Sequence, residues 1–158
     1  MSSHQANHVS FGTDGFRGVI AKDFTYDIVR KTAQGMADYV AYKYMRTEKP
    51  TIAVGYDRRF MSDRFARTLA EVLAANGLNV TLGSTPLPTP AVSLLTAKGY
   101  GMGVVITASH NDHHYNGIKV KQNGPAACHT GNRSCFYVKW ENGQWVEHSK
   151  PLFNPDDV

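Results

Sequence analysis

Apolar residues recur along the chain with two periods, one typical of helices and one typical of strands. Residues 25–47 carry apolar side chains at helical spacing, which predicts an amphipathic helix with Thr25 as its N-cap. Two more helices are predicted, from the candidate cap Ser62 to the left-handed C-cap Asn76-Gly77, and from the cap Thr89, followed by Pro90, to about Ala97. Short apolar, β-rich runs predict strands at Thr51–Tyr56, Leu78–Leu82, Gly103–Thr107 and Gly117–Lys121.

Strands that alternate with helices predict an α/β sheet covered on both faces. The last two strands are close in sequence, so we expect them to pair antiparallel and to make the sheet mixed. The expected fold is therefore a three-layer α/β/α domain with a mixed, mostly parallel four-stranded sheet. We place this domain at residues 11–150, after a tail at 1–10 and before a linker at 151–158. Within it, residues 11–20 read as a Gly-rich loop with a strand fragment, and Phe136–Val146 as a hairpin that turns at Asn142-Gly143.

Length and composition limit the class of protein. The chain has 158 residues, of which 42% are hydrophobic and 19% charged, as in one soluble globular domain. No apolar run is long enough to span a membrane and no signal peptide is visible, so we expect a cytoplasmic protein without a membrane partner. A net charge of +4 favours acidic ligands such as phosphates. Scattered basic residues do not indicate nucleic acid, and the spacing of Cys128 and Cys135 predicts neither a disulfide nor a zinc site.

The segment with most chemistry is the polar turn between the last two predicted strands. Ser109 lies at the end of a strand, with His110, Asn111, Asn116 and Lys119 close to it in sequence. It is either a turn serine that satisfies backbone groups or a group that reacts. The GxSxG pattern of hydrolases is missing. A phosphoserine is another use of such a residue, and its negative charge requires a nearby cation or metal.

Three other segments are candidates for a site. Arg17 follows a run with three glycines in Phe11–Gly18, where the backbone can approach a phosphate closely, although a surface ion pair is the alternative. Asp57-Arg58-Arg59 directly follows a buried strand, where open α/β sheets place functional groups, or it is a charge cluster at a helix entry. His113 and His114 lack a third ligand at fixed spacing, so they do not predict a metal site.

Four segments in order along the chain resemble the first domain of the α-D-phosphohexomutases. They are Phe11–Gly18, Val54–Arg59, Thr85–Pro90, and Thr107–Asn111 together with Asn116–Lys119. The resemblance is closest to the phosphoglucomutase/phosphomannomutase branch, and the phosphoglucosamine mutases share much of the pattern. It implies an intramolecular phosphotransferase that interconverts hexose 1-phosphate and hexose 6-phosphate, of glucose or mannose, through a bisphosphate.

The resemblance also implies residue roles. Ser109 would carry the phosphoryl group, and its phosphate would be the ligand that this chain gives to Mg²⁺. Lys119 and His110 would assist proton transfer, and Arg17 would hold charge near the phosphoserine. We assign substrate contacts to Thr13, Asn111 and Asn116.

The chain departs from the family pattern in three places. Asp112 stands where the family usually has proline, and no Asp-Gly-Asp run is present to hold Mg²⁺. Family members have four domains, so we expect the metal ligands and the sugar-reading loops to belong to the remaining mutase domains, and this chain alone to turn over little. Residues 128–138 depart abruptly, which suggests either a divergent loop or two compensating frameshifts. A non-catalytic sugar-phosphate binding module and a serine phosphatase remain alternative functions.

Overall fold

The computed structural model describes residues 15–46, 48, 50–122, 138–141 and 144–147. Helices and strands alternate along the chain as the apolar pattern predicts. The elements are β1 Phe16–Val19, α1 Tyr26–Lys43, β2 Ile52–Tyr56, α2 Ser62–Ala75, β3 Val80–Leu82, α3 Thr89–Ala97, β4 Met102–Ile106, β5 Tyr115–Gln122, β6 Val138–Glu141 and β7 Gln144–Glu147.

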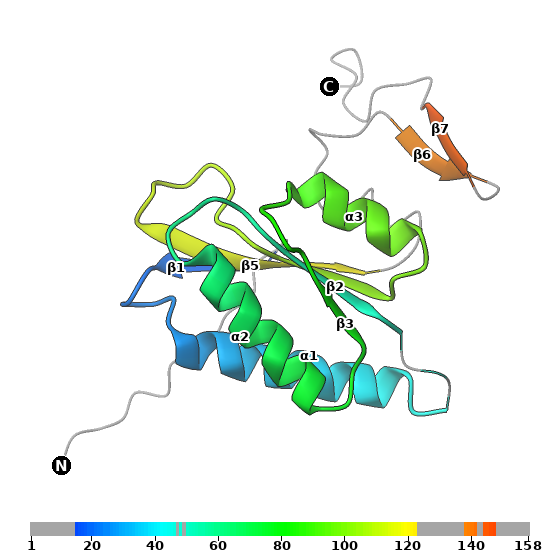
Figure 1. The fold of residues 1–158 in the computed structure, drawn as a ribbon, viewed down its shortest axis with the longest axis horizontal. Coiled ribbons are helices and arrows are strands. Elements are labelled where there is room, and N and C mark those ends of the chain that lie inside the picture. Colours follow the sequence, from blue (N-terminus) through cyan, green and yellow to red (C-terminus); the bar gives the residue numbers. More distant parts are fainter. Residues whose placement is uncertain (1–14, 47, 49, 123–137, 142–143, 148–158) are drawn as a thin grey trace, which may run out of the picture.

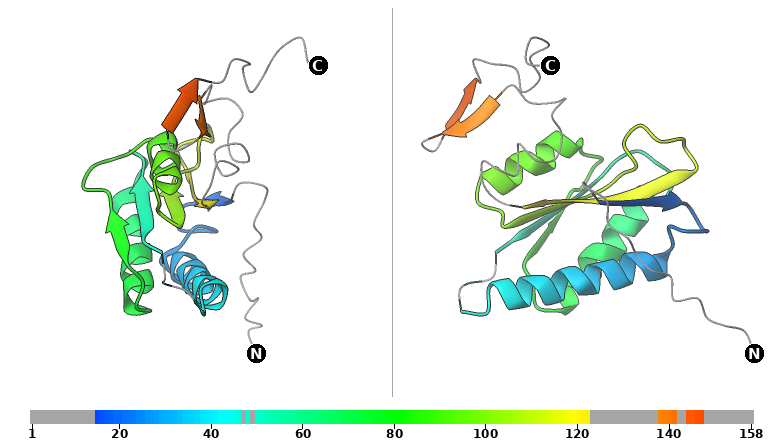
Figure 2. Two further views of the ribbon diagram at one scale, coloured as in Figure 1. Left: turned by 90° about the vertical axis from the view of Figure 1, so that its right-hand side faces the viewer. Right: turned by 180° about the vertical axis from the view of Figure 1, so that it is seen from behind.

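Five strands form one mixed sheet in the order β1-β5-β4-β2-β3 (Figure 1). Strands β2, β3 and β4 are parallel, and β5 runs antiparallel to both of its neighbours. Helices α1 and α2 lie on one face of the sheet and α3 on the other, which gives three layers (Figure 2). The predicted α/β class and the mixed sheet are confirmed.

The predicted count of four strands is one too low, because the strand fragment predicted within residues 11–20 is an edge strand of the same sheet, β1. This strand approaches β5 very closely. A Cβ on Gly15, whose φ is +136°, would lie 2.0 Å from the carbonyl oxygen of Ile118. A Cβ on Gly117 would lie 2.4 Å from the carbonyl oxygen of Phe16. The absence of a side chain at both glycines therefore permits the close pairing of β1 with β5.

The core is divided between the two faces of the sheet. The larger part packs α1 and α2 against the sheet, with Phe24, Phe65 and Leu69 fully buried. The smaller part, Ala53, Val92 and Val105, lies beneath α3. Each fully buried side chain of this size contributes about 1.5–3 kcal/mol, so most of the stabilisation of the sheet comes from the α1 and α2 face.

The helix ends match the predictions in part. Thr25 caps α1, with its Oγ1 accepting from the N–H of Ile28 at 3.4 Å. Gly77 has φ +72° after α2, in agreement with the predicted left-handed C-cap. The predicted cap Ser62 is wrong, because Met61 holds the N-cap position and the hydroxyl of Ser62 donates to Asp57 instead. The predicted cap of α3 shifts by one residue, from Thr89 to Pro88.

Strands β6 and β7 form the predicted hairpin, with Glu141 opposite Gln144 across two intervening residues. Among the residues described, no helix is both long and apolar enough to cross a membrane.

Candidate active site

The serine loop, residues 107–114, connects β4 to β5 at one end of the sheet. Ser109 is exposed and has φ +57°, a left-handed conformation that non-glycine residues rarely adopt. Its N–H donates to Thr107 Oγ1 at 3.0 Å, and the N–H of Asn111 donates to the carbonyl of Ala108 at 3.0 Å. A left-handed residue other than glycine costs about 1–2 kcal/mol, so contacts from outside the loop must hold this shape.

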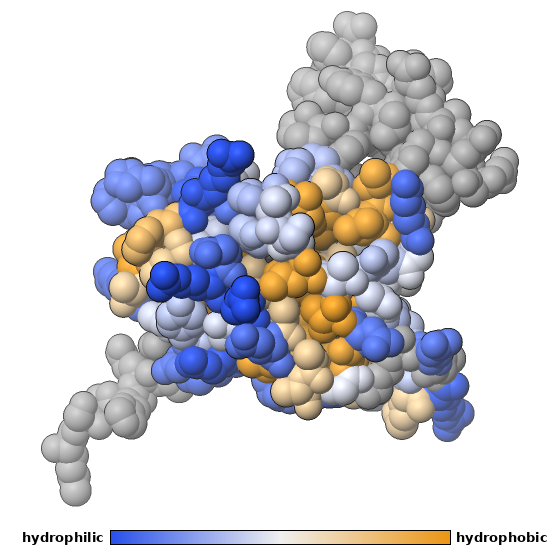
Figure 3. Space-filling model, in the orientation of Figure 1, coloured by the Kyte–Doolittle hydropathy of each residue, from blue (hydrophilic) through white to orange (hydrophobic). Residues whose placement is uncertain are grey.

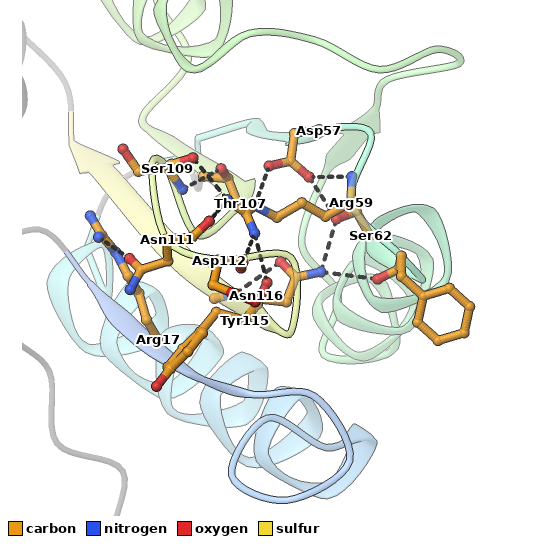
Figure 4. Close-up of polar contacts among 12 residues, drawn as sticks. Arg17, Asp57, Arg59, Ser62, Thr107, Ser109, Asn111, Asp112, Tyr115 and Asn116 are labelled. Carbon is orange, nitrogen blue, oxygen red and sulfur yellow. Dashed lines mark hydrogen bonds and ion pairs between the residues drawn. The ribbon is translucent and has the colours of Figure 1, made fainter.

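Arg59 supplies those contacts from the neighbouring strand end (Figure 4). Strands β2 and β4 are parallel neighbours, so the segments that follow them meet at the same edge of the sheet. The guanidinium of Arg59 donates to four carbonyl oxygens of the loop and its exit. These belong to Ser109 at 2.9 Å, Asn111 at 2.6 Å, Asp112 at 2.7 Å and Tyr115 at 3.0 Å. The motif at residues 57–59 therefore shapes the serine loop.

A polar chain anchors Arg59 to the sheet and to α2. Asp57 Oδ1 accepts from the Arg59 N–H at 2.9 Å and from Ser62 Oγ at 2.8 Å, and its Oδ2 lies 3.4 Å from Arg59 Nε. Asn116 Nδ2 in turn donates to Ser62 Oγ at 2.9 Å. These hydrogen bonds join the segment after β2 and the start of α2 to the start of β5.

Asn116 is fully buried, and its amide is occupied by the protein. Besides its bond to Ser62 it donates to the carbonyl of Phe60, and its Oδ1 accepts from the N–H of Gly117. The predicted substrate contact does not fit this geometry, because the amide points into the fold. These hydrogen bonds give Asn116 a structural role, which is to join the start of β5 to Phe60 and Ser62.

Arg17 reaches the serine loop from β1. Its Nη1 donates to Asn111 Oδ1 at 2.6 Å (Figure 4). Both residues are part-buried. The N-terminal motif and the serine motif, more than ninety residues apart, thus meet at one place. The amide of Asn111 can still turn its Nδ2 toward a ligand.

Lys119 lies on the same face of the sheet as Arg17. Arg17 stands opposite Gly117, and side chains two residues apart on a strand share a face. Lys119 is 3% exposed and stands opposite Val105 of β4, beside the core beneath α3. His110 is exposed on the serine loop. Thr13 lies outside the described residues.

Hydrophilic residues gather at the serine-loop end of the molecule, at the upper left of Figure 3. There Asp112, His113 and His114 hold three possible ligand atoms within 4.8 Å of one another. The N–H and the imidazole of His114 both hydrogen-bond Asp112 Oδ1, at 2.8 Å and 2.5 Å, and hold the pKa of this carboxyl below its ordinary value. The carboxylate is thereby engaged within the loop.

Mg²⁺ prefers several oxygen ligands. Two carboxylates of the described site are hydrogen-bonded within the protein, Asp57 to Arg59 and Ser62, and Asp112 to His114. Imidazole nitrogens are poor ligands for this ion. These residues do not form a magnesium site by themselves.

The structure is thus a three-layer α/β/α domain whose exposed serine lies on a constrained loop held by two arginines. The family model "Phosphoglucomutase/phosphomannomutase, alpha/beta/alpha domain I" matches residues 8–131, and the chain belongs to this family. A solved structure of a putative phosphomannomutase from Thermus thermophilus is 38% identical, with a TM-score of 0.68. The alignment covers 72% of this chain and 25% of that one.

A more distant structure supports the fold alone. It is a phosphoglucomutase/phosphomannomutase family protein from Burkholderia thailandensis, 24% identical with a TM-score of 0.61, and it matches 74% of this chain and 28% of its own.

A short segment resembles a different enzyme. Over 41 residues the chain is 93% identical to the phosphoribosyl-AMP cyclohydrolase of Pelobacter propionicus and 88% identical to that of Trichlorobacter lovleyi. Each match covers 26% of this chain and 33% of the cyclohydrolase. The chain therefore spans about a third of the length of these curated relatives and a quarter of the Thermus mutase.

Proposed function

We propose that this chain is the phosphoserine-bearing domain of a phosphoglucomutase/phosphomannomutase and that Ser109 carries the phosphoryl group. The observation that supports this most directly is the serine loop itself. Ser109 is exposed in a left-handed conformation after the end of β4, and two arginines bond to its loop, Arg17 from β1 and Arg59 from the segment that follows β2. A structural turn serine requires neither the exposure nor two cations.

In the proposed reaction, a hydroxyl oxygen of a hexose monophosphate attacks the phosphorus on Ser109. The new O–P bond forms as the bond from phosphorus to Ser109 Oγ breaks, and the product is a hexose bisphosphate. The proton of the attacking hydroxyl passes to His110 or Lys119, and Ser109 Oγ is left to accept a proton. Reversal with the other phosphate regenerates phosphoserine. Arg17 and Lys119 lie on one face of the sheet, where their charge stabilises the transferring group.

The same proposal implies that this chain by itself has little mutase activity. Enzymes of this family are expected to use Mg²⁺, for which this chain offers one ligand, the phosphate on Ser109. The other metal ligands and the sugar-reading loops would come from further mutase domains. We therefore expect little mutase turnover from this chain with glucose 1-phosphate and glucose 1,6-bisphosphate.

Intact-mass spectrometry tests the phosphoryl carrier. The purified chain is incubated with glucose 1,6-bisphosphate and Mg²⁺, and phosphate uptake is located by peptide mapping. We expect one phosphate on Ser109 and none in Ser109→Ala. Uptake at another residue, or none in either protein, would favour the non-catalytic sugar-phosphate binding module. The same incubation with glucosamine 1,6-bisphosphate tests the phosphoglucosamine mutase alternative, because faster phosphate uptake from this donor than from glucose 1,6-bisphosphate would favour that branch.

We also propose that the 41 cyclohydrolase-like residues lie at the C-terminal end. The family match ends at residue 131, and 27 residues follow it in a chain of 158. A 41-residue match that ends at Val158 begins at Ile118 and overlaps the family match by 14 residues. The sequence leaves the mutase pattern at residues 128–138, inside this stretch. Cys128 and Cys135 would then belong to an in-frame piece of another enzyme, and no frameshift is needed.

Genomic reads across the codons for residues 110–140 separate the two explanations. The frameshift hypothesis requires that a one-nucleotide shift over residues 128–138 encodes Ala-Thr-Pro-Glu-Ile-Glu, because a helix beginning near Thr-Pro-Glu is expected there from the resemblance to the mutases. A fusion predicts one uninterrupted frame, with this string in no shifted frame. Finding that string in a shifted frame would restore the frameshift hypothesis. Since two thirds of the cyclohydrolase length is missing, we expect no hydrolysis of phosphoribosyl-AMP by the purified chain.

A further inference from the structure

We propose that Arg59 is a positioning residue that fixes the serine loop in the conformation in which Ser109 can be phosphorylated. The effect of Arg59 on phosphorylation rests on the function proposed above. Its effect on the shape of the loop does not, because that follows from the contacts alone. Arg59 touches no substrate in this role and acts only through the main chain of the loop.

The shape of the arginine side chain matches this task. Its planar guanidinium carries five N–H donors in a rigid fork, whereas lysine has one nitrogen. Arg59 uses Nη1 for the carbonyls of Asp112 and Tyr115, and Nη2 for those of Ser109 and Asn111. One side chain thereby ties together both arms of the loop.

These bonds determine which way the loop presents its groups. In a trans peptide the C=O of one residue and the N–H of the next point in opposite directions. Since Arg59 holds the carbonyl of Ser109, the N–H of His110 points away from the guanidinium. The carbonyl oxygens of Asn111 and Asp112 are likewise turned toward Arg59. Their partial negative charges thus face a cation instead of the phosphate that Ser109 would carry.

Arg59 is itself held in place. Its side chain is 15% exposed, and Asp57 accepts from its main-chain N–H and lies beside its Nε. Asp57 is fixed by the buried hydroxyl of Ser62. The position of the guanidinium is thus set by β2 and α2 before any ligand binds, as preorganisation of a reactive group requires.

The test compares Arg59→Ala and Arg59→Lys with Arg58→Ala. Arg58 is the matched control, because it is exposed and makes no hydrogen bond or ion pair within the described ranges. The first measurement is hydrogen–deuterium exchange of peptides that cover residues 107–115. We expect at least about tenfold faster exchange there in both Arg59 variants, unchanged exchange in β2 and α1, and wild-type behaviour for Arg58→Ala. Wild-type exchange of this loop in both Arg59 variants would overturn the proposal.

The second measurement is the rate of phosphate uptake at Ser109 from glucose 1,6-bisphosphate. We expect a fall of about tenfold or more in both Arg59 variants. Millimolar guanidinium should restore uptake in Arg59→Ala, where it can fill the vacated site, and not in Arg59→Lys. Uptake at the wild-type rate in Arg59→Ala, despite a loosened loop, would refute the catalytic part of the proposal. If the wild-type chain takes up no phosphate, the proposed function fails, and the exchange result still decides whether Arg59 positions the loop.

Discussion

Arg17 and Asn111 are joined by a 2.6 Å hydrogen bond from the guanidinium to the side-chain oxygen, across a separation of 94 residues. The bond ties the edge strand β1 to the serine loop and brings a positive charge to Asn111, two residues after Ser109. Arg17 lies opposite Gly117 in β1–β5 pairing, so the register of an edge strand sets its place. The N-terminal motif therefore contributes to the site through strand pairing.

Replacing Arg17 tests this contribution. A hydrogen bond to a charged group is worth about 1.5–3 kcal/mol, and each 1.4 kcal/mol corresponds to a factor of about ten in rate. We expect Arg17→Ala to slow phosphate uptake at Ser109 by about 10–100-fold, measured by intact mass. Arg17→Lys should recover part of this loss, because it retains the charge without the planar fork. Equal rates in all three proteins would show that Arg17 acts only in the fold.

Gly117 and Gly35 form a matched pair for the close approach of β1 to β5. A Cβ at Gly117 would meet the carbonyl oxygens of Phe16 at 2.4 Å and Thr107 at 2.9 Å, whereas one at Gly35 in α1 would meet nothing within 4 Å. We expect Gly117→Ala to lower the free energy of unfolding by about 1–3 kcal/mol through overpacking. Gly35→Ala should raise it by about 0.5–1 kcal/mol, because alanine favours the helix.

Urea unfolding followed by circular dichroism measures both changes. Equal stability of Gly117→Ala and the wild type would mean that β1 can move away from β5 without loss. In that case the proposed coupling of Arg17 to strand pairing would also be weakened.

The sequence predicted the parts of the fold that depend on local patterns. The amphipathic face of α1, the Gly77 C-cap and the buried runs of β2 and β4 are all readable from neighbouring residues. The sequence predicts only a strand fragment within residues 11–20 and no place for it in the sheet, because Phe16–Val19 has no alternation of its own and pairs with β5, about a hundred residues later.

The site was predicted less completely for a similar physical reason. Ser109 and Arg17 belong to recognisable motifs, and the structure joins Arg17 of β1 to the serine loop through Asn111. The function of Arg59 was left open because its partners are main-chain carbonyls, which leave no mark in the sequence. Asn116 was taken for a substrate contact because it adjoins the serine motif. Its place in the strand turns it toward Ser62 instead.

Asn116→Ala separates the structural role from the predicted substrate contact. The change removes the side-chain oxygen that accepts from the buried N–H of Gly117, and it removes the amide that donates to Ser62 Oγ, which still donates to Asp57. Burying an unsatisfied polar group costs about 1–3 kcal/mol, so we expect a loss of that size in urea unfolding. The affinity of the folded protein for glucose 1,6-bisphosphate, measured by calorimetry, should stay within about twofold. Weaker binding with unchanged stability would restore the substrate role.

Asp112 and His114 give a pH dependence whose sign can be stated. Hydrogen bonds from the main chain and side chain of His114 lower the pKa of Asp112 below its ordinary value of 3.8. A carboxyl whose pKa is depressed in the folded state stabilises the fold above its unfolded pKa, and this contribution is lost as the pH falls through the folded pKa. Since the pair is exposed, the effect should be local to the serine loop. An NMR titration of the Asp112 carboxyl is expected to show a midpoint below 3.8 in the wild type and a higher one in His114→Ala. The same midpoint in both proteins would mean that His114 does not hold the carboxylate in solution.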